Sequence, residues 1–352
     1  MTADDIIARR LINQRIAESE FKEPARLVSW MVAMQAQVWD MAKWAIGLRV
    51  SGSSNASVEM AFDEGTILRT HVMRPTWHFV SPADIRWLLK LTAPRVHAIN
   101  AYQYRQTGLD AKKLNRGANL LAKALVDGKY LTRDELKNSL NPIKLSGDGV
   151  QLACAMMYAE LEGLICSGPR IGKQFSYALM DERVPNNKNF TREDALAEFA
   201  KRYFQSRGPA TLQDFSTWSG LSMKDIREAV EMIGSSLLKD TCDDKEYYFF
   251  DTELKDVKKL QSTFLMPDYD EYGMAYKNRV AVIDTEVISM QKLIQAMVYT
   301  HFITVDGKVA GTWRRSQSGK QLELETNYFA PIAKTKEQTV DKAMKKYLKF
   351  FS

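Results

Sequence analysis

The sequence predicts an α+β fold in which groups of helices alternate with short β-hairpins. Three observations support this prediction. A helix-start signature recurs along the chain, an order of three helices and a hairpin occurs three times, and the C-terminal part alternates polar and apolar residues as strands do. Three helices followed by a hairpin are typical of a winged helix. We therefore expect three tandem winged-helix domains and a small β-rich C-terminal region.

The size and charge of the chain are consistent with such a protein. Its 352 residues exceed what one hydrophobic core normally serves, and 45% of them are hydrophobic. The net charge of +6 favours a polyanionic partner. No apolar stretch is long enough to cross a bilayer, and the N-terminal residues lack the apolar segment of a signal peptide. We expect a cytoplasmic protein with no membrane contact, and a monomer by default.

The helix-start signature is Ser or Thr followed three residues later by Asp or Glu. The hydroxyl oxygen accepts a hydrogen bond from the backbone amide three positions on, and the acid binds the amide of the capping residue. The signature begins at Thr2, Ser81, Thr132, Thr191, Thr211 and Ser222.

The first predicted domain covers residues 1–110. It begins with a helix over residues 3–18, and a second helix enters through Pro24. The glutamine-containing segment MVAMQAQVWDMAKW and a helix that continues to Arg49 follow. The strands TILRTHVM and TWHFV complete the domain as a hairpin with Arg74 at its tip.

The remaining chain divides into three further predicted domains. Residues 111–188 and residues 189–253 each repeat the order of three helices and a hairpin. Residues 254–352 form the β-rich region, with an Asp-Gly turn in VDGK and a closing helix in KEQTVDKAMKKYLKFF.

Two glutamines, Gln35 and Gln37, interrupt an otherwise apolar stretch. Because a Gln side chain carries a full hydrogen-bonding amide, the pair either faces water, satisfies backbone groups or binds something. Side chains two residues apart diverge by about 200° on an α-helix but converge in extended or turn geometry. A shared role therefore predicts that the helix ends or bends near Gln35.

Six segments together resemble one known family. They are NQRI, MQAQ, RTHVMRPTWHFVSPADIRWLL, GPATLQDFSTWSGL, LMPDYDEYGMAYKNR and VDGKVAGTWRR. Taken together and in their order along the chain, these segments resemble the winged-helix DNA glycosylases of the AlkZ/YcaQ type. The resemblance implies a C-shaped protein with a basic concave surface around DNA. It also implies a catalytic signature, which falls on Gln35-Ala36-Gln37 and is similar to that of the AlkZ branch. The implied substrate is double-stranded DNA with bulky or N7-alkylated purines, crosslinks included.

The chemistry of such a substrate suits a neutral amide. N7-alkylation makes guanine cationic, so the base leaves without protonation by a general acid. The protein then has to place a water near C1′ and offer fixed dipoles, which the carbonyls of Gln35 and Gln37 can supply. We expect a monofunctional DNA glycosylase without a cofactor. The alternative is a non-catalytic winged-helix DNA-binding protein or transcriptional regulator.

Eight further side chains are candidate DNA contacts. Phosphate contacts need a cation or hydrogen-bond donor with reach, and hairpins present such groups. The candidates are Arg74, Thr76, His78, Arg170, Lys173, Arg314, Arg315 and Lys320. Solvated turns and strands would produce the same pattern.

The sequence favours no metal site. His71 and His78 could face each other across the first hairpin, but a catalytic zinc needs a third ligand. Asp268, Asp270 and Glu271 would suit a magnesium-dependent nuclease, although the resemblance implies that this segment is structural. A phosphate loop and a serine-hydrolase elbow are both absent from the sequence.

Overall fold

A computed structural model describes the chain except for residues 146–148, 185–188, 253–259, 284–288, 290–300 and 319–320. The chain is a mixed helix and sheet protein and forms two compact units. The first unit comprises Met1–Val58, Ala197–Trp218 and Ser222–Ser352, and the second comprises Glu59–Leu196 and Ser219–Leu221. The four-domain division expected from the sequence stays a prediction.

The first unit combines helices from both ends of the chain with three groups of strands. All or most of the following helices belong to it: α1 (Ala3–Asn13), α2 (Pro24–Met31), α3 (Trp39–Arg49), α10 (Arg192–Arg207), α11 (Leu212–Ser219), α12 (Met223–Ile233), α13 (Glu271–Met274) and α15 (Lys334–Phe351). Its strands are β1 (Ala33–Gln35), β7 (Leu238–Cys242), β8 (Lys245–Phe249), β9 (Phe264–Met266), β10 (Phe302–Val305), β11 (Lys308–Ser318) and β12 (Gln321–Tyr328). Among the described residues, no helix is both long and apolar enough to span a bilayer.

Helix α1 is shorter than the sequence predicts. It ends at Asn13, because Arg15 adopts a left-handed conformation with φ of 59°. The N–H of Ile16 then donates back to the carbonyl of Leu11 at 2.9 Å. This bond satisfies a carbonyl that the helix end would otherwise leave without a partner.

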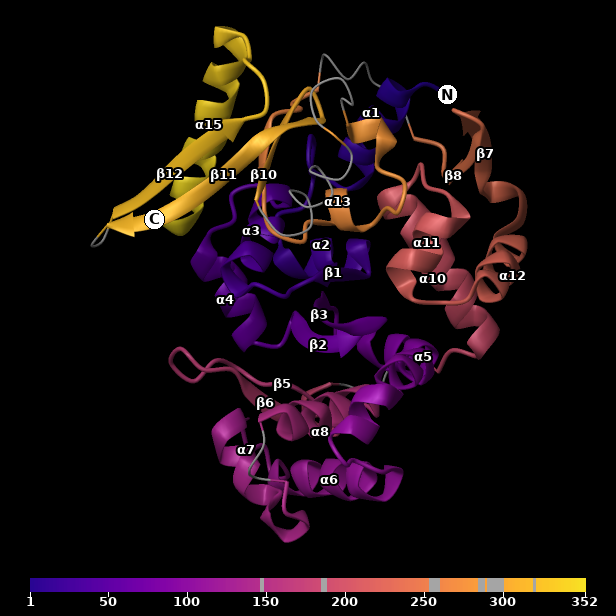
Figure 1. The fold of residues 1–352 in the computed structure, drawn as a ribbon, viewed down its shortest axis with the longest axis vertical. Coiled ribbons are helices and arrows are strands. Elements are labelled where there is room, and N and C mark those ends of the chain that lie inside the picture. Colours follow the sequence, from indigo (N-terminus) through magenta and orange to yellow (C-terminus); the bar gives the residue numbers. More distant parts are fainter. Residues whose placement is uncertain (146–148, 185–188, 253–259, 284–288, 290–300, 319–320) are drawn as a thin grey trace. The chain divides into compact units, whose positions relative to one another are not determined.

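The C-terminal part of the first unit is a four-stranded antiparallel sheet in the order β12-β11-β10-β9. A two-residue turn at Asp306 and Gly307, both with positive φ, joins β10 to β11 as the Asp-Gly signal predicts. Helix α15 packs along this sheet (Figure 1), where the rings of Tyr347 and Trp313 lie 4.8 Å apart. The closing helix expected from the sequence is therefore present.

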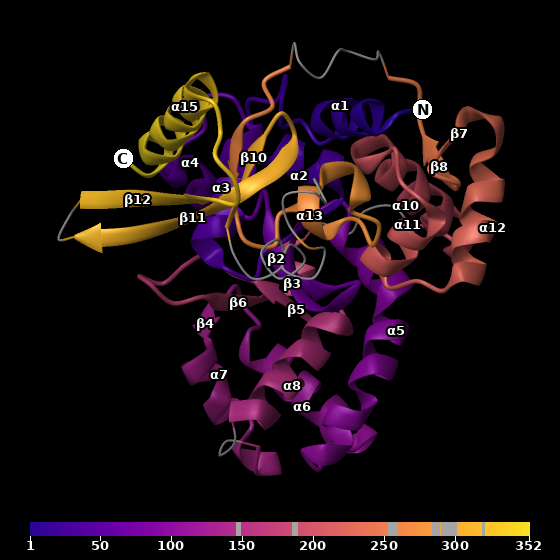
Figure 2. The same cartoon turned by 45° about the horizontal axis from the view of Figure 1, so that its top comes forward.

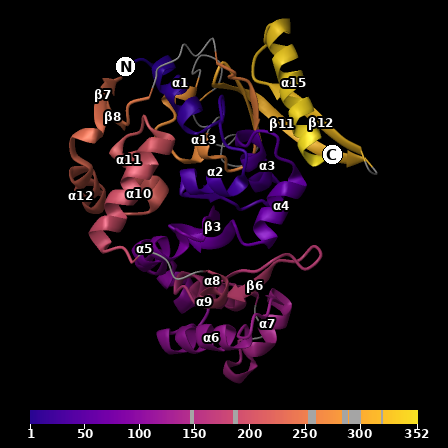
Figure 3. The ribbon, with the colours of Figure 1, turned by 180° about the vertical axis from the view of Figure 1, so that it is seen from behind.

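A second group in the first unit has an aromatic core. Helices α10, α11 and α12 are followed by the hairpin β7–β8 (Figure 3). Tyr203 stacks on Phe215 with ring centroids 4.5 Å apart, and Phe199 and Trp218 lie against them. The backbone of Tyr248 in β8 pairs with Ala210, just before α11. Three helices followed by a hairpin is the order of elements that the sequence predicts for residues 189–253.

The second unit contains a similar succession of elements. All or most of the following helices belong to it: α4 (Asn55–Asp63), α5 (Ile85–Gln106), α6 (Ala111–Ala124), α7 (Arg133–Ser139), α8 (Gly149–Leu161) and α9 (Met180–Arg183). Its strands are β2 (Leu68–Val72), β3 (Arg74–Val80), β4 (Leu131–Thr132), β5 (Ile165–Ser167) and β6 (Ser176–Leu179). Helices α6 and α8 lie side by side (Figure 2) over a core that includes Leu121, Leu136 and Leu152.

The hairpin β2–β3 corrects one expectation from the sequence. His71 lies opposite Trp77 in the register, and His78 lies opposite Thr70. Since neighbouring residues of a strand point to opposite faces, His71 and His78 do not face each other as a zinc pair would. His71 instead contacts the buried carboxylate of Glu160.

Five of the six helix-start signatures cap a helix as predicted, with the first hydroxyl accepting from the amide three residues on. The signature at Ser81 is the exception, since α5 begins only at Ile85 with Asp84 as its N-cap. The carboxylate of Asp84 accepts from the Ser81 hydroxyl at 2.7 Å and from the Trp87 indole at 3.0 Å.

Gly47 marks a close approach of α3 to α15. A Cβ there would lie 2.4 Å from the buried ring of Phe350. Alanine normally stabilises a helix interior relative to glycine by about 1 kcal/mol, but overpacking costs about 1–3 kcal/mol. We expect Gly47→Ala to lower the melting temperature. Gly149→Ala in α8, where a Cβ meets nothing within 4 Å, is the control and should not lower it. Equal melting temperatures for both variants would contradict this packing.

Candidate active site

The segment that carries the two glutamines is not helical. Helix α2 ends at Met31, the chain is extended from Ala33 to Gln35, and it bends at Gln37 before α3 begins. Gln35 is buried at 7% exposure and Gln37 is half-buried. The geometric requirement stated from the sequence, that the helix end near Gln35, is confirmed.

The break in the helix is imposed against local preference. Val32, directly after α2, has φ of 62° and ψ of −55°. A β-branched residue with positive φ is a genuine outlier, and such strain persists only where the surrounding structure over-determines it. Contacts from distant parts of the chain must therefore hold this turn.

A buried ion pair supplies these contacts. Glu271, at the start of α13, accepts the backbone N–H of Gln35 through Oε1 at 2.9 Å. Its Oε2 accepts from Arg207 Nε at 3.0 Å, from Arg207 Nη2 at 2.8 Å and from Trp218 Nε1 at 2.8 Å. Glu271 is 1% exposed and Arg207 is 0% exposed, so the pair is desolvated.

Arginines of α10 also bind backbone carbonyls in this region. Arg207 Nη1 donates to the carbonyl of Met31 at 2.8 Å, and Nη2 donates to that of Ala33 at 2.7 Å. Arg202 donates to the carbonyl of Ser29. The end of α2 therefore receives its hydrogen bonds from cationic side chains, which also favour a helix C-terminus electrostatically.

A second buried ion pair lies next to the first. Arg49 binds Asp270 through two bonds of 2.8 and 2.7 Å and donates to the backbone and side chain of Gln14. Asp270 and Glu271 are thus bound by arginines, as the structural role implied for their segment requires. Asp268 contacts His301. The described part of the chain holds no group of three or more acidic, His or Cys side chains arranged for a metal.

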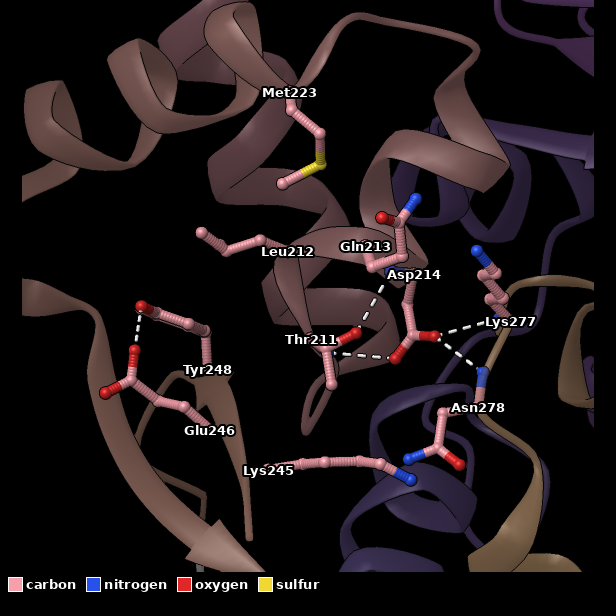
Figure 4. Close-up of a pocket in the computed structure, with 10 residues that line it drawn as sticks. All are labelled: Thr211, Leu212, Gln213, Asp214, Met223, Lys245, Glu246, Tyr248, Lys277 and Asn278. Carbon is pink, nitrogen blue, oxygen red and sulfur yellow. Dashed lines mark hydrogen bonds between the residues drawn. The ribbon is translucent and has the colours of Figure 1, made fainter.

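A pocket of about 590 Å³ lies over the start of α11 and does not include either glutamine (Figure 4). Its lining residues are Thr211, Leu212, Gln213, Asp214, Met223, Lys245, Glu246, Tyr248, Lys277 and Asn278. Asp214 is fully buried and accepts the backbone N–H groups of Lys277 and Asn278 at 2.8 and 2.9 Å. Asp214 therefore anchors the chain that follows α13.

The predicted DNA contacts of the first hairpin differ in exposure. Arg74 and Thr76 are half-buried, whereas the ring of His78 is fully buried. His78 Nδ1 lies 2.9 Å from the carbonyl oxygen of Thr76, and Nε2 lies 3.4 Å from Arg74 Nη2. The structure places His78 beneath Arg74 rather than at the surface.

The other predicted DNA contacts also differ in their exposure and in their partners. Arg170 and Lys173 lie in the connection between β5 and β6, where Lys173 is exposed and the Arg170 guanidinium lies 4.8 Å from the ring of Phe175. On β11, Arg314 is exposed. Arg315 is half-buried and binds Asp40 at 2.8 Å. Lys320 lies outside the described residues.

The sequence pointed to neither Arg207 nor Trp218, and it gave Asp214 only as the acid of the helix-start signature at Thr211. Arg207 follows directly on FQS in α10 and resembles any basic residue near a helix end. The signal available in the sequence was the pair Asp270-Glu271 in an apolar context, since buried acids need cationic partners. Which arginines pair with them depends on the tertiary structure.

Comparisons with known proteins agree with this architecture. The structure superposes on that of the Streptomyces sahachiroi DNA glycosylase AlkZ with a TM-score of 0.82, covering 99% of this chain and 96% of that one at 20% identity. The two proteins share a fold, and that fold is the one of a DNA glycosylase.

The sequence identifies the family itself. The model of the AlkZ-like DNA glycosylases matches residues 28–350, so the chain belongs to the AlkZ-like DNA glycosylase family. A curated relative, the interstrand DNA cross-link repair glycosylase of Streptomyces sahachiroi, is 23% identical over 327 residues, which covers 88% of this chain and 86% of that protein. The chain is accordingly a DNA-binding repair enzyme of the glycosylase class.

The Asp40–Arg315 pair predicts a pH-dependent stability. Burial opposes ionisation of Asp40, but the hydrogen bond from Arg315 and the charge of Lys43 outweigh it and lower the pKa of Asp40 below its usual value. A depressed pKa in the folded state stabilises the protein above the unfolded value of about 3.9 and loses this effect as the pH falls through the folded pKa.

We therefore expect Asp40→Asn to melt at a lower temperature than the wild type at pH 7, with the difference shrinking as the pH falls from about 5 to below 3.9. Thermal unfolding across this range measures it. A difference that stays constant with pH would show that packing, not the ion pair, is lost.

Proposed function

We propose that this protein hydrolyses the N-glycosidic bond of bulky or N7-alkylated purines in double-stranded DNA, as a monofunctional glycosylase. The observation that supports the proposal is the break in helical geometry between α2 and α3, in the segment that carries Gln35 and Gln37, in a chain of this family. Interstrand crosslinks are included, because the Streptomyces sahachiroi relative is described as an interstrand DNA cross-link repair glycosylase.

In the proposed reaction the glutamines act on water rather than on the base. The bonding pair of the C1′–N9 bond leaves with the alkylated guanine and neutralises its positive charge, so no general acid is needed. Water adds its oxygen to C1′, and its proton passes to solvent. The carbonyl oxygens of Gln35 and Gln37 accept hydrogen bonds from this water and orient it, and their dipoles stabilise the developing positive charge on the sugar.

The proposed DNA-binding surface uses a subset of the predicted contacts. We propose three tandem winged helices arranged as a C around the duplex, acting as a cytoplasmic monomer. Phosphate-binding groups are Arg74, Thr76, Arg170, Lys173, Arg314 and Lys320. His78 and Arg315 are retained as supporting residues, because His78 is buried against Arg74 and Arg315 is bound to Asp40.

The first test is base release from DNA that contains N7-alkylguanine. We expect Gln37→Ala to slow the single-turnover rate by about 100-fold and Gln35→Ala to slow it by at least about tenfold, with little change in DNA affinity. Val38→Ala is the matched control, since Val38 is 38% exposed in the same segment. It should release base at the wild-type rate.

Two outcomes would reject this assignment. If Gln37→Ala releases base as fast as the wild type, the glutamine carries no catalytic role. If the wild type binds alkylated DNA without forming abasic sites, the chain is a non-catalytic DNA-binding protein, and the proposed activity is wrong.

A second test separates two neighbouring arginines of β11. A phosphate contact contributes about one unit to the slope of log affinity against log salt. We expect Arg314→Ala to reduce this slope by about one. Arg315→Ala should leave the slope unchanged and lower the melting temperature, because its guanidinium is bound by Asp40. Equal slope changes for the two variants would contradict the assignment.

A further inference from the structure

The backbone of the glutamine segment is bound along one edge by two charged side chains from distant parts of the chain. Arg207 binds the carbonyls of Met31 and Ala33, and Glu271 binds the N–H of Gln35. We propose that Arg207 and Glu271 are positioning residues that set the directions of Gln35 and Gln37 during base excision. This inference rests on the proposed function.

The pattern of bonds is that of a neighbouring strand. In an extended chain the backbone groups of residues i, i+2 and i+4 point to the same side. The carbonyl of Ala33 and the N–H of Gln35, both in β1, follow this spacing, and the third bound group is the carbonyl of Met31 at the end of α2. Along this edge the ion pair therefore takes the place of a β-strand, and it fixes which way alternate side chains point.

The ion pair also accounts for the strained turn. Val32 lies between the two carbonyls that Arg207 binds and has φ of 62°. Without the guanidinium, the carbonyls on either side of Val32 would lose the donor that favours this turn over ordinary helical geometry. In that geometry Gln35 and Gln37 would diverge by about 200°, and one water could not contact both.

Glu271 is itself held rigidly. Its Oε2 accepts from the indole N–H of Trp218 as well as from Arg207. Further along, the hydroxyl of Tyr276 donates to the carbonyl of Arg207 at 2.7 Å. Asp214 then binds the amides of Lys277 and Asn278 (Figure 4). A site built on residues that are themselves fixed by hydrogen bonds keeps the geometry that catalysis requires.

Positioning matters more for this site than for one with a charged base. A carboxylate attracts and polarises water by its charge, whereas a neutral amide acts through the direction of its dipole. A displacement of about 1 Å can cost about 100-fold in rate. A side chain that directs the glutamines should therefore affect the chemical step much more than DNA binding.

The neighbouring ion pair offers a matched control. Glu271→Gln and Asp270→Asn each remove one buried carboxylate bound by one arginine, from adjacent residues. Glu271 contacts the glutamine segment, whereas the bonds described for Asp270 go to Arg49 and to the amide of Tyr272. Both variants should lose thermal stability. Only the loss of Glu271 should also disturb the direction of Gln35.

The experiment measures the melting temperature of each variant. At a temperature well below the lowest of these, it then compares the single-turnover rate of base release at saturating enzyme and the affinity for alkylated DNA. We expect Glu271→Gln to slow base release at least about tenfold with DNA affinity within about twofold of the wild type. Asp270→Asn should retain a rate within about threefold despite a comparable loss of melting temperature. Equal rates for the two variants would overturn the proposal.

Milder substitutions keep the test decisive if Glu271→Gln does not fold. Trp218→Phe removes one neutral donor to Glu271 Oε2, and Arg207→Lys keeps the charge but cannot reach Glu271, Met31 and Ala33 together. We expect both to slow base release without weakening DNA binding, Arg207→Lys more strongly. Wild-type rates for both would overturn the positioning role. Gln37→Ala, measured in parallel, reports separately on whether the glutamines act at all.

Discussion

The candidate active site depends on the buried ion pair between Arg207 and Glu271. Arg207 lies at the end of α10 and Glu271 at the start of α13, and together they bind the backbone between α2 and α3. An unpaired charge in the interior costs several kcal/mol, so neither side chain can be buried without the other. Bringing the pair together also brings three separate segments of the chain to one place.

The polar side chains around this pair are themselves hydrogen-bonded to one another. Arg49 and Asp270 form a second ion pair, and Gln14 links Arg49 to the hydroxyl of Tyr276. Burial raises the pKa of Tyr276 to about 12, so its hydroxyl stays neutral and donates to the carbonyl of Arg207. Such a network is expensive to leave incomplete, which makes one arrangement of these segments strongly preferred over others.

The positive charge of the chain is divided between its interior and its surface. Net charge counts every basic residue equally, yet Arg49 and Arg207 are fully buried and bind carboxylates. Arg314 and Arg315 are neighbours in the sequence, but only Arg315 reaches Asp40. Because the partners lie far away along the chain, the sequence alone could not separate structural arginines from those available to DNA.

The sequence by itself determined the features that depend on near neighbours. Five helix caps, the Asp306-Gly307 turn, the closing helix and the family motifs all rest on residues a few positions apart. The structure alone decided where α2 ends. Apolar residues continue past Met31, and the partners that stop the helix lie 176 and 236 residues from the groups they bind. Only tertiary packing brings such distant charges together, and only their mutual neutralisation lets them remain buried.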